Sequence, residues 1–165
     1  MAAKGLYSLR EAYKLAKEGA EDPHLWLVLV GETGSGKTHL AAAIANERIK
    51  RGQATCLVVV PDLLDYLRSA FSPESRISYD EAFESIRTAP LLILDDLGAH
   101  SSTPWAEEKL YQLVNHRYNH RLPTVVTTNL WLDQIDERLA SRLADVKVST
   151  VCRIWAPSYR ASPQA

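Results

Sequence analysis

Residues 31–38 read G-E-T-G-S-G-K-T, and this stretch decides the fold. It fills every fixed position of the pattern G-x-x-x-x-G-K-[S/T], whose glycines let successive backbone N–H groups turn inward around a polyphosphate. An apolar run of strand length, residues 25–30, comes just before it, and a strong helix former, residues 39–48, follows it. Strand, glycine-rich loop and helix together predict a P-loop, because the N-terminus of the helix adds unpaired N–H groups and a positive dipole end.

Each part of this loop has an expected role. We expect Lys37 to reach the β- and γ-phosphates of ATP, and the Thr38 hydroxyl to ligate Mg²⁺. A dinucleotide-binding loop is excluded, because His39 stands where the third glycine of that pattern would lie. The expected ATP-binding residues are Gly31, Glu32, Thr33, Gly34, Ser35, Gly36, Lys37, Thr38 and His39.

Length and composition limit the classes of function. A chain of 165 residues is long enough for one domain with a proper core, and its 46% hydrophobic and 24% charged residues are typical of a soluble globular protein. The net charge of −1 does not indicate a nucleic-acid binder, so any such surface must be a local patch. Because no apolar stretch reaches transmembrane length and no signal-peptide core follows the N-terminus, we expect a cytoplasmic protein without membrane contact.

Cysteines and histidines do not predict a metal site. Cys56 and Cys152 each lie inside an apolar run, which favours buried free thiols over a disulfide. His116 and His120 are four residues apart, but no glutamate follows the first histidine as a zinc protease requires. We therefore interpret the two histidines as solvated helix surface.

Strand-like and helix-like runs alternate along the rest of the chain. Apolar runs predict further strands at residues 54–60, 91–94, 123–127 and 146–155. Helical spacing predicts helices at residues 63–67, 79–87, 103–121 and 135–144. Because the strands are continuously apolar, we expect a mostly parallel sheet covered by helices on both faces, which is a three-layer α/β/α P-loop fold.

Two acids at the end of one predicted strand supply the second half of the expected site. Residues 91–96 read L-L-I-L-D-D. We expect Asp95 to hold Mg²⁺ through its water shell, and Asp96 to polarise the water that attacks the γ-phosphate. A strand that simply ends in a polar turn is the alternative, and the preceding P-loop favours the functional interpretation.

Polar residues further along the chain are weaker candidates. The next predicted strand ends in T-T-N, and the amide of Asn129 both donates and accepts hydrogen bonds, so it can orient a water or contact the γ-phosphate. Arg138 and Arg142 share one helix face, where they repel one another unless anions lie opposite. From composition alone, a solvated basic face is the better interpretation of the two arginines.

Taken together, these motifs resemble bacterial helicase loaders of the DnaC/DnaI type and the related IstB-like transposition ATPases, within the AAA+ class. The resemblance spans about residues 6–160 and rests on residues 31–46, 91–98, 105–118, 123–129 and 138–143. It implies a five-stranded AAA+ core with Asn129 as the first sensor residue. It also implies that Arg142 is the arginine finger, which completes the ATP site of a neighbouring subunit, with Arg138 assisting. Members of this family assemble on single-stranded DNA, and loaders place the replicative helicase there.

The expected domain organisation is a helical lead over residues 1–20, the AAA+ core over residues 21–157 and a frayed tail over residues 158–165. A loader usually carries an N-terminal helicase-binding domain, and here only the short lead precedes the core. Either the chain is an excised domain or the helicase contact is missing. The chain also ends soon after the fifth predicted strand, so we expect no C-terminal lid domain, and loaders of this type lack that lid too.

The segment between the second and third predicted strands is the candidate DNA surface. In the helicase-loader family that this sequence resembles, the corresponding insertion lines the inner face of a spiral assembly. Arginines there can follow phosphates while an aromatic ring stacks on a base. The alternative is that the aromatic residues belong to the core of a helical hairpin. The candidate residues are Tyr66, Arg68, Phe71 and Arg76.

Three functional hypotheses follow. The favoured one is an oligomerising, Mg²⁺-dependent ATPase of the helicase-loader type, with a helicase or a transposase as the open alternatives for its protein partner. A P-loop small-molecule kinase is disfavoured, because no lid or acceptor pocket is visible after Arg142. A module that binds ATP to hold an assembly and hydrolyses it slowly stays open, because Asp96 stands where AAA+ enzymes more usually have a longer glutamate.

Overall fold

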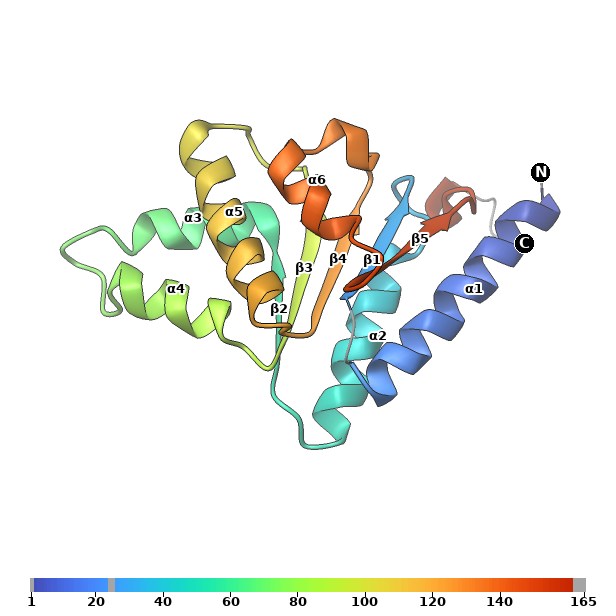
Figure 1. The fold of residues 1–165 in the computed structure, drawn as a ribbon, viewed down its shortest axis with the longest axis horizontal. Coiled ribbons are helices and arrows are strands. Elements are labelled where there is room, and N and C mark those ends of the chain that lie inside the picture. The colour runs from blue at the N-terminus through green and yellow to red at the C-terminus, as the bar shows by residue number, and fades with distance from the viewer. Residues whose placement is uncertain (1, 24–25, 162–165) are drawn as a thin grey trace.

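The fold is a single parallel sheet between two layers of helices (Figure 1). The computed structural model describes residues 2–23 and 26–161. All four strand pairings are parallel, so the predicted three-layer α/β/α fold is confirmed and the sheet is wholly rather than mostly parallel. The strand order is β2-β3-β4-β1-β5. The strands are β1 Trp26–Gly31, β2 Thr55–Val59, β3 Leu91–Leu97, β4 Thr124–Thr128 and β5 Ser149–Ile154.

Helices cover both faces of this sheet, as Figure 1 shows. One layer contains α1 Ala2–Glu21 and α2 Lys37–Lys50. The other contains α3 Val60–Ser69, α4 Tyr79–Arg87, α5 Pro104–Asn119 and α6 Glu137–Leu143. Two 3₁₀ turns, η1 Leu132–Gln134 and η2 Tyr159–Ala161, complete the described elements. None of the described helices is both long and apolar enough to cross a membrane.

Alternate residues of the central strands fill two separate cores. Val28 and Val30 of β1 belong to the core under α3, α4, α5 and α6, whereas Leu27 and Leu29 belong to the core under α1 and α2. Side chains of a strand point alternately to opposite faces, so a strand buried on both sides must be apolar at every position. This requirement explains the continuous apolar runs of the sequence.

The ends of several elements differ from the sequence-based expectation. Val60 begins α3 rather than ending β2, because Pro61 is well suited to the first turn of a helix. Of the predicted frayed tail, residues 159–161 form η2, and the Tyr159 N–H donates to the Gly34 carbonyl over 3.0 Å. Residues 162–165 of that tail, and Leu25 of the predicted first strand, lie outside the described residues.

Arg117 of α5 is fully buried and ties this helix to the starts of β3 and β4. Its guanidinium donates to the carbonyls of Arg87 (2.9 Å), Ala89 (2.8 Å) and Pro123 (2.5 Å) and to the Thr124 hydroxyl (2.9 Å). Burial lowers the pKa of Arg117 to about 10, so the side chain stays charged at neutral pH. One side chain therefore supplies donors to carbonyls that precede β3 and β4, of which the Pro123 carbonyl also accepts a hydrogen bond from the Leu92 N–H over 3.2 Å.

Replacing Arg117 by alanine should strongly destabilise the protein. The variant leaves the carbonyls of Arg87 and Ala89 without this donor, and each buried unsatisfied group costs about 1–3 kcal/mol, so we expect a loss of about 2 kcal/mol or more. Urea unfolding followed by circular dichroism measures this loss. The control is Arg51→Ala, which removes an exposed arginine that pairs with Glu47 and should cost about 0.5 kcal/mol or less. Equal stability of the two variants would refute the anchoring role.

Candidate functional site

The glycine-rich loop of residues 31–38 closes onto the N-terminus of α2. Gly34 and Gly36 have φ angles of +83° and +100°, in the left-handed region that side chains disfavour. A side chain at Gly34 would also clash with Ser158. Gly36 is the N-cap of α2 and, being a glycine, has no side chain that could accept a hydrogen bond from the first turn of the helix. The loop thus leaves helix N–H groups available to an anion.

Lys37 lies inside this loop with only 7% of its surface exposed. Its ammonium donates to the carbonyls of Gly31 (2.8 Å) and Glu32 (2.9 Å). Burial lowers the pKa of Lys37, and the nearby carboxylates of Asp96 and Asp95 partly oppose that shift. Because an ammonium has three N–H groups and two are used here, one remains for an incoming anion.

The carboxylate of Asp95, on β3, links the first turn of α2 to β4. The Thr38 hydroxyl donates to Asp95 Oδ1 over 3.0 Å, and the Thr127 hydroxyl donates to the same oxygen over 2.6 Å. Asp95 is 4% exposed at the end of β3. Within the described part of the chain, the hydrogen-bond donors to Asp95 are the neutral hydroxyls of Thr38 and Thr127, so no hydrogen-bonded cation competes with a metal ion for this carboxylate. A carboxylate and a hydroxyl with room for waters and phosphate oxygens are ligands that Mg²⁺ accepts.

Asp96 is turned out of the regular strand by a β-bulge. The register between β3 and β4 shifts between Leu94 and Leu97, and Asp96 has a φ of +61°. Its N–H donates to the Thr127 hydroxyl over 2.9 Å, which holds this unusual backbone in place. A non-glycine residue in the left-handed region costs about 1 kcal/mol or more and is often found where a side chain must be aimed at a ligand.

The end of β4 lies beside these acids. The Thr128 hydroxyl donates to the Leu97 carbonyl over 2.7 Å, so the carboxyl ends of β3 and β4 are tied together. Asn129 follows directly and is exposed at this edge of the sheet. Thr127 contacts both Asp95 and Asp96, and it is a functional candidate that the sequence analysis missed. The sequence shows Thr127 at the end of a predicted strand, but it does not predict the β-bulge that brings the two acids to this threonine.

The two predicted arginines of α6 both fold onto α5. Arg142 Nε donates to Asn115 Oδ1 (3.1 Å), and its Nη2 donates to the Tyr111 hydroxyl (3.3 Å). Arg138 instead pairs with Glu108 (3.3 Å). Among the described residues, neither arginine hydrogen-bonds to the loop of residues 31–38 of its own chain. The structure therefore brings Lys37, Thr38, Asp95, Asp96 and Asn129 to one edge of the sheet, and it holds the two arginines through hydrogen bonds to α5.

The candidate DNA residues lie at and after α3, at the opposite end of the sheet from β5 (Figure 1). Tyr66 is 42% and Phe71 57% exposed, so the alternative that they are buried core residues is wrong. Phe71 stacks on Tyr79 with ring centroids 4.4 Å apart. Arg68 lies over the Trp105 ring and pairs with Asp65, and Arg76 is exposed.

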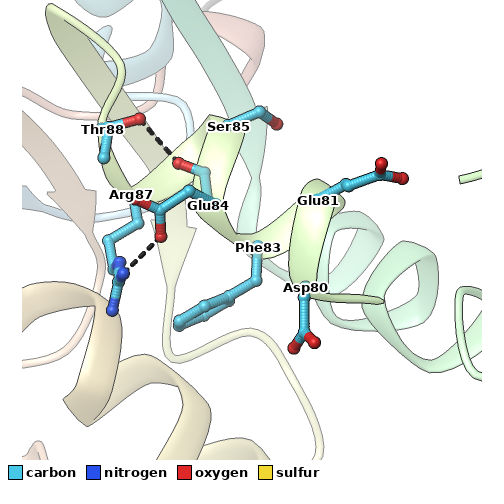
Figure 2. A pocket seen from close by; sticks show the side chains of 7 residues that line it. All are labelled: Asp80, Glu81, Phe83, Glu84, Ser85, Arg87 and Thr88. Atoms are coloured by element: carbon cyan, nitrogen blue, oxygen red, sulfur yellow. Dashed lines mark hydrogen bonds and ion pairs between the residues drawn. The ribbon is translucent and has the colours of Figure 1, made fainter. Parts of the chain in front are cut away.

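A surface hollow on α4 does not suit a phosphate ligand. Figure 2 shows that Asp80, Glu81 and Glu84 project from this helix, and that Arg87 pairs with Glu84. Three carboxylates with one guanidinium that is already paired would repel a polyphosphate. The hollow is lined by Asp80, Glu81, Phe83, Glu84, Ser85, Arg87 and Thr88.

Comparisons with known proteins agree with this geometry. The family model described as IstB-like ATP binding protein matches residues 15–161. The replicative helicase loader DnaI of Bacillus subtilis is 34% identical over 110 residues, which cover 66% of this chain and 34% of that protein. The replicative helicase loader DnaC of Escherichia coli is 28% identical over 118 residues, which cover 72% of this chain and 48% of that protein.

A solved structure gives the same result for the fold. The crystal structure of DnaI superposes with a TM-score of 0.72 at 28% identity, and the match covers 90% of this chain and 82% of that one. The chain spans less than half the length of the two curated relatives. The resemblance drawn from the motifs is confirmed, and ATP is the ligand in the family's description. The chain belongs to the family of IstB-like ATP-binding proteins and has the AAA+ P-loop fold of the DnaC and DnaI helicase loaders.

Proposed function

We propose that this chain is a Mg²⁺-dependent ATPase domain that assembles on single-stranded DNA with its nucleotide between subunits, as a helicase loader. The observation that carries this proposal is the set of hydrogen bonds through which Asp95 joins Thr38 of α2 to Thr127 of β4. Through these bonds, the Thr38 hydroxyl and the Asp95 carboxylate lie beside the uncapped N-terminus of α2. That combination is what a metal-bound triphosphate requires.

The proposed binding step uses the loop amides and Lys37. The ammonium of Lys37 would exchange its bonds to the Gly31 and Glu32 carbonyls for phosphate oxygens, which carry full charges and bind more strongly. Thr38 and Asp95 are the residues that would hold Mg²⁺, whose charge neutralises the β- and γ-phosphate oxygens. His39, Thr33 and Glu32 are exposed and would contact the nucleotide from the rim of the loop.

The proposed hydrolytic residues are Asp96 and Asn129. The bulge separates the direction of Asp96 from that of Asp95, so one acid can serve the metal while the other accepts a proton from water. Asn129 follows the tied end of β4 and would orient that water or the γ-phosphate. Asp96 is shorter than glutamate, which favours slow hydrolysis within an assembly over rapid turnover.

The proposed assembly and partners are carried over from the relatives. The relatives named DnaI and DnaC are replicative helicase loaders, and each is more than twice as long as the segment matched here. We propose Arg142 as the finger that reaches a neighbour's γ-phosphate. A transposition ATPase remains the alternative, since the matching family takes its name from IstB. The family match argues against a small-molecule kinase.

The exposed aromatic and basic residues around the end of α3 support a DNA-binding surface. Phe71 presents more than half of its surface to solvent while Tyr79 stacks beneath it. An exposed ring with a rigid support is suited to stack on a base, and Arg68 and Arg76 would follow the phosphates. The acidic outer face of α4 is unsuited to DNA, so we place the contact at the α3 side of the segment.

The division of labour between the two acids can be tested by conservative substitution. Asp95→Asn should weaken Mg²⁺-dependent ATP binding, because it removes the negative charge that attracts the metal. Asp96→Asn should leave ATP affinity unchanged and lower the hydrolysis rate by about 10²-fold or more, the range for general acid–base catalysis. Calorimetric titration and single-turnover hydrolysis measure the two effects. Equal loss of ATP affinity in both variants would contradict the assignment.

The DNA surface can be tested by the salt dependence of binding. Arg68→Ala combined with Arg76→Ala should weaken single-stranded DNA binding and reduce the slope of log K against log salt by about 1.4, from about 0.7 per lost phosphate contact. Fluorescence anisotropy with a labelled oligonucleotide measures the slope. Lys50→Ala with Arg51→Ala removes the same charge at the far end of α2 and is the control. If both double variants change the slope equally, the α3 surface is not the DNA site.

A further inference from the structure

The side chain of Arg142 is held in one orientation by neutral groups of α5. Its Nε donates to Asn115 Oδ1 over 3.1 Å, and its Nη2 donates to the Tyr111 hydroxyl over 3.3 Å. The guanidinium carbon lies 5.2 Å from the centre of the Tyr111 ring and 5.9 Å from that of Tyr118. Nη1 donates to the Arg138 carbonyl one turn earlier on α6. Contacts from two helices thus fix a side chain that would otherwise be flexible.

The neighbouring Arg138 has a different environment. Its guanidinium pairs with the Glu108 carboxylate over 3.3 Å and with the Asp136 carboxylate over 3.5 Å. Among the described residues, no carboxylate lies within 4.0 Å of Arg142, so its positive charge is not neutralised in the same way. Arg138 therefore anchors α6 on α5 through ion pairing. Arg142 is oriented by neutral groups and, among the described residues, is not paired with a carboxylate.

The hydrogen bonds of Arg142 also leave suitable donors free. A guanidinium has five N–H groups, one on Nε and two on each terminal nitrogen. The three hydrogen bonds to Asn115, Arg138 and Tyr111 use one N–H on each nitrogen, so within the described residues one N–H remains on Nη1 and one on Nη2. A pair of N–H groups on the two terminal nitrogens matches two oxygens of a phosphate.

We infer that Tyr111 and Asn115 are positioning residues for Arg142, which preset its guanidinium for the γ-phosphate bound by the next subunit. This inference rests on the proposed function, in which Arg142 acts on a neighbour's ATP. An arginine side chain carries about 2 kcal/mol of rotamer entropy, and fixing it before the reaction lowers the cost of reaching the transition state. Neutral acceptors are needed, because a carboxylate would fix the side chain equally well but compete with the phosphate for its charge.

Asn115→Asp is the sharpest variant, because it is nearly isosteric and turns the amide acceptor into a carboxylate. A purely structural contact would be kept or strengthened by this change. The positioning role predicts instead that kcat falls about tenfold while the KM for ATP and the urea stability stay near wild type. Tyr111→Phe removes one hydrogen bond and keeps the ring, and it should also lower kcat without lowering ATP affinity. Asn119→Asp adds the same charge one turn later on α5, at an exposed position, and should change neither kcat nor KM.

Mixed assemblies separate this inference from the proposed function. Arg142→Ala should lose about 10³-fold or more in hydrolysis with normal ATP affinity, as removal of an arginine finger does. A Lys37→Ala subunit keeps an intact finger, so adding it should restore hydrolysis to Asn115→Asp and Arg142→Ala subunits alike. Full activity of Arg142→Ala alone would refute the finger and with it the proposed assembly. An inactive Arg142→Ala beside fully active Asn115→Asp and Tyr111→Phe would refute the positioning role and leave the finger in place.

Discussion

The carboxylate of Asp95 is the point where the P-loop helix, the acidic strand and its neighbour meet. Thr38 reaches it from α2 and Thr127 reaches it from β4, and the Thr127 hydroxyl also accepts a hydrogen bond from the Asp96 backbone. Because the same threonine holds both acids, the metal-facing carboxylate and the bulge that turns Asp96 outward depend on one hydroxyl. The proposed chemistry therefore rests on parallel strands β1, β4 and β3 lying in this order, which brings their carboxyl ends to one edge.

Features encoded by local sequence could be predicted. The glycines of residues 31–38, the apolar strands and the acids after residue 94 follow from short-range chemistry, and the structure places them together as expected. Contacts between distant segments could not be predicted. Thr127 looks like an ordinary strand residue until the bulge at Asp96 brings it to both acids, and Arg117 looks like a surface cation until α5 places it over the starts of β3 and β4.

The arginines of α6 illustrate the same limit. Their spacing indicates a shared face, and composition alone favoured a solvated basic surface. The structure distinguishes them because α5 offers a carboxylate, Glu108, to Arg138 and neutral acceptors, Asn115 and Tyr111, to Arg142. That difference depends on the register between two helices about 30 residues apart in sequence, which no local pattern specifies.

The nucleotide site is tested most directly by a calorimetric titration of the chain with ATP in the presence of Mg²⁺, compared with the Lys37→Ala variant. We expect saturable binding by the wild type. We expect no measurable binding over the same concentration range by the variant, because the loop amides alone do not neutralise the triphosphate. Circular dichroism of the variant should match that of the wild type, which shows that the variant is folded. Undiminished ATP affinity in a folded Lys37→Ala protein would contradict the central claim that residues 31–38 form the nucleotide site.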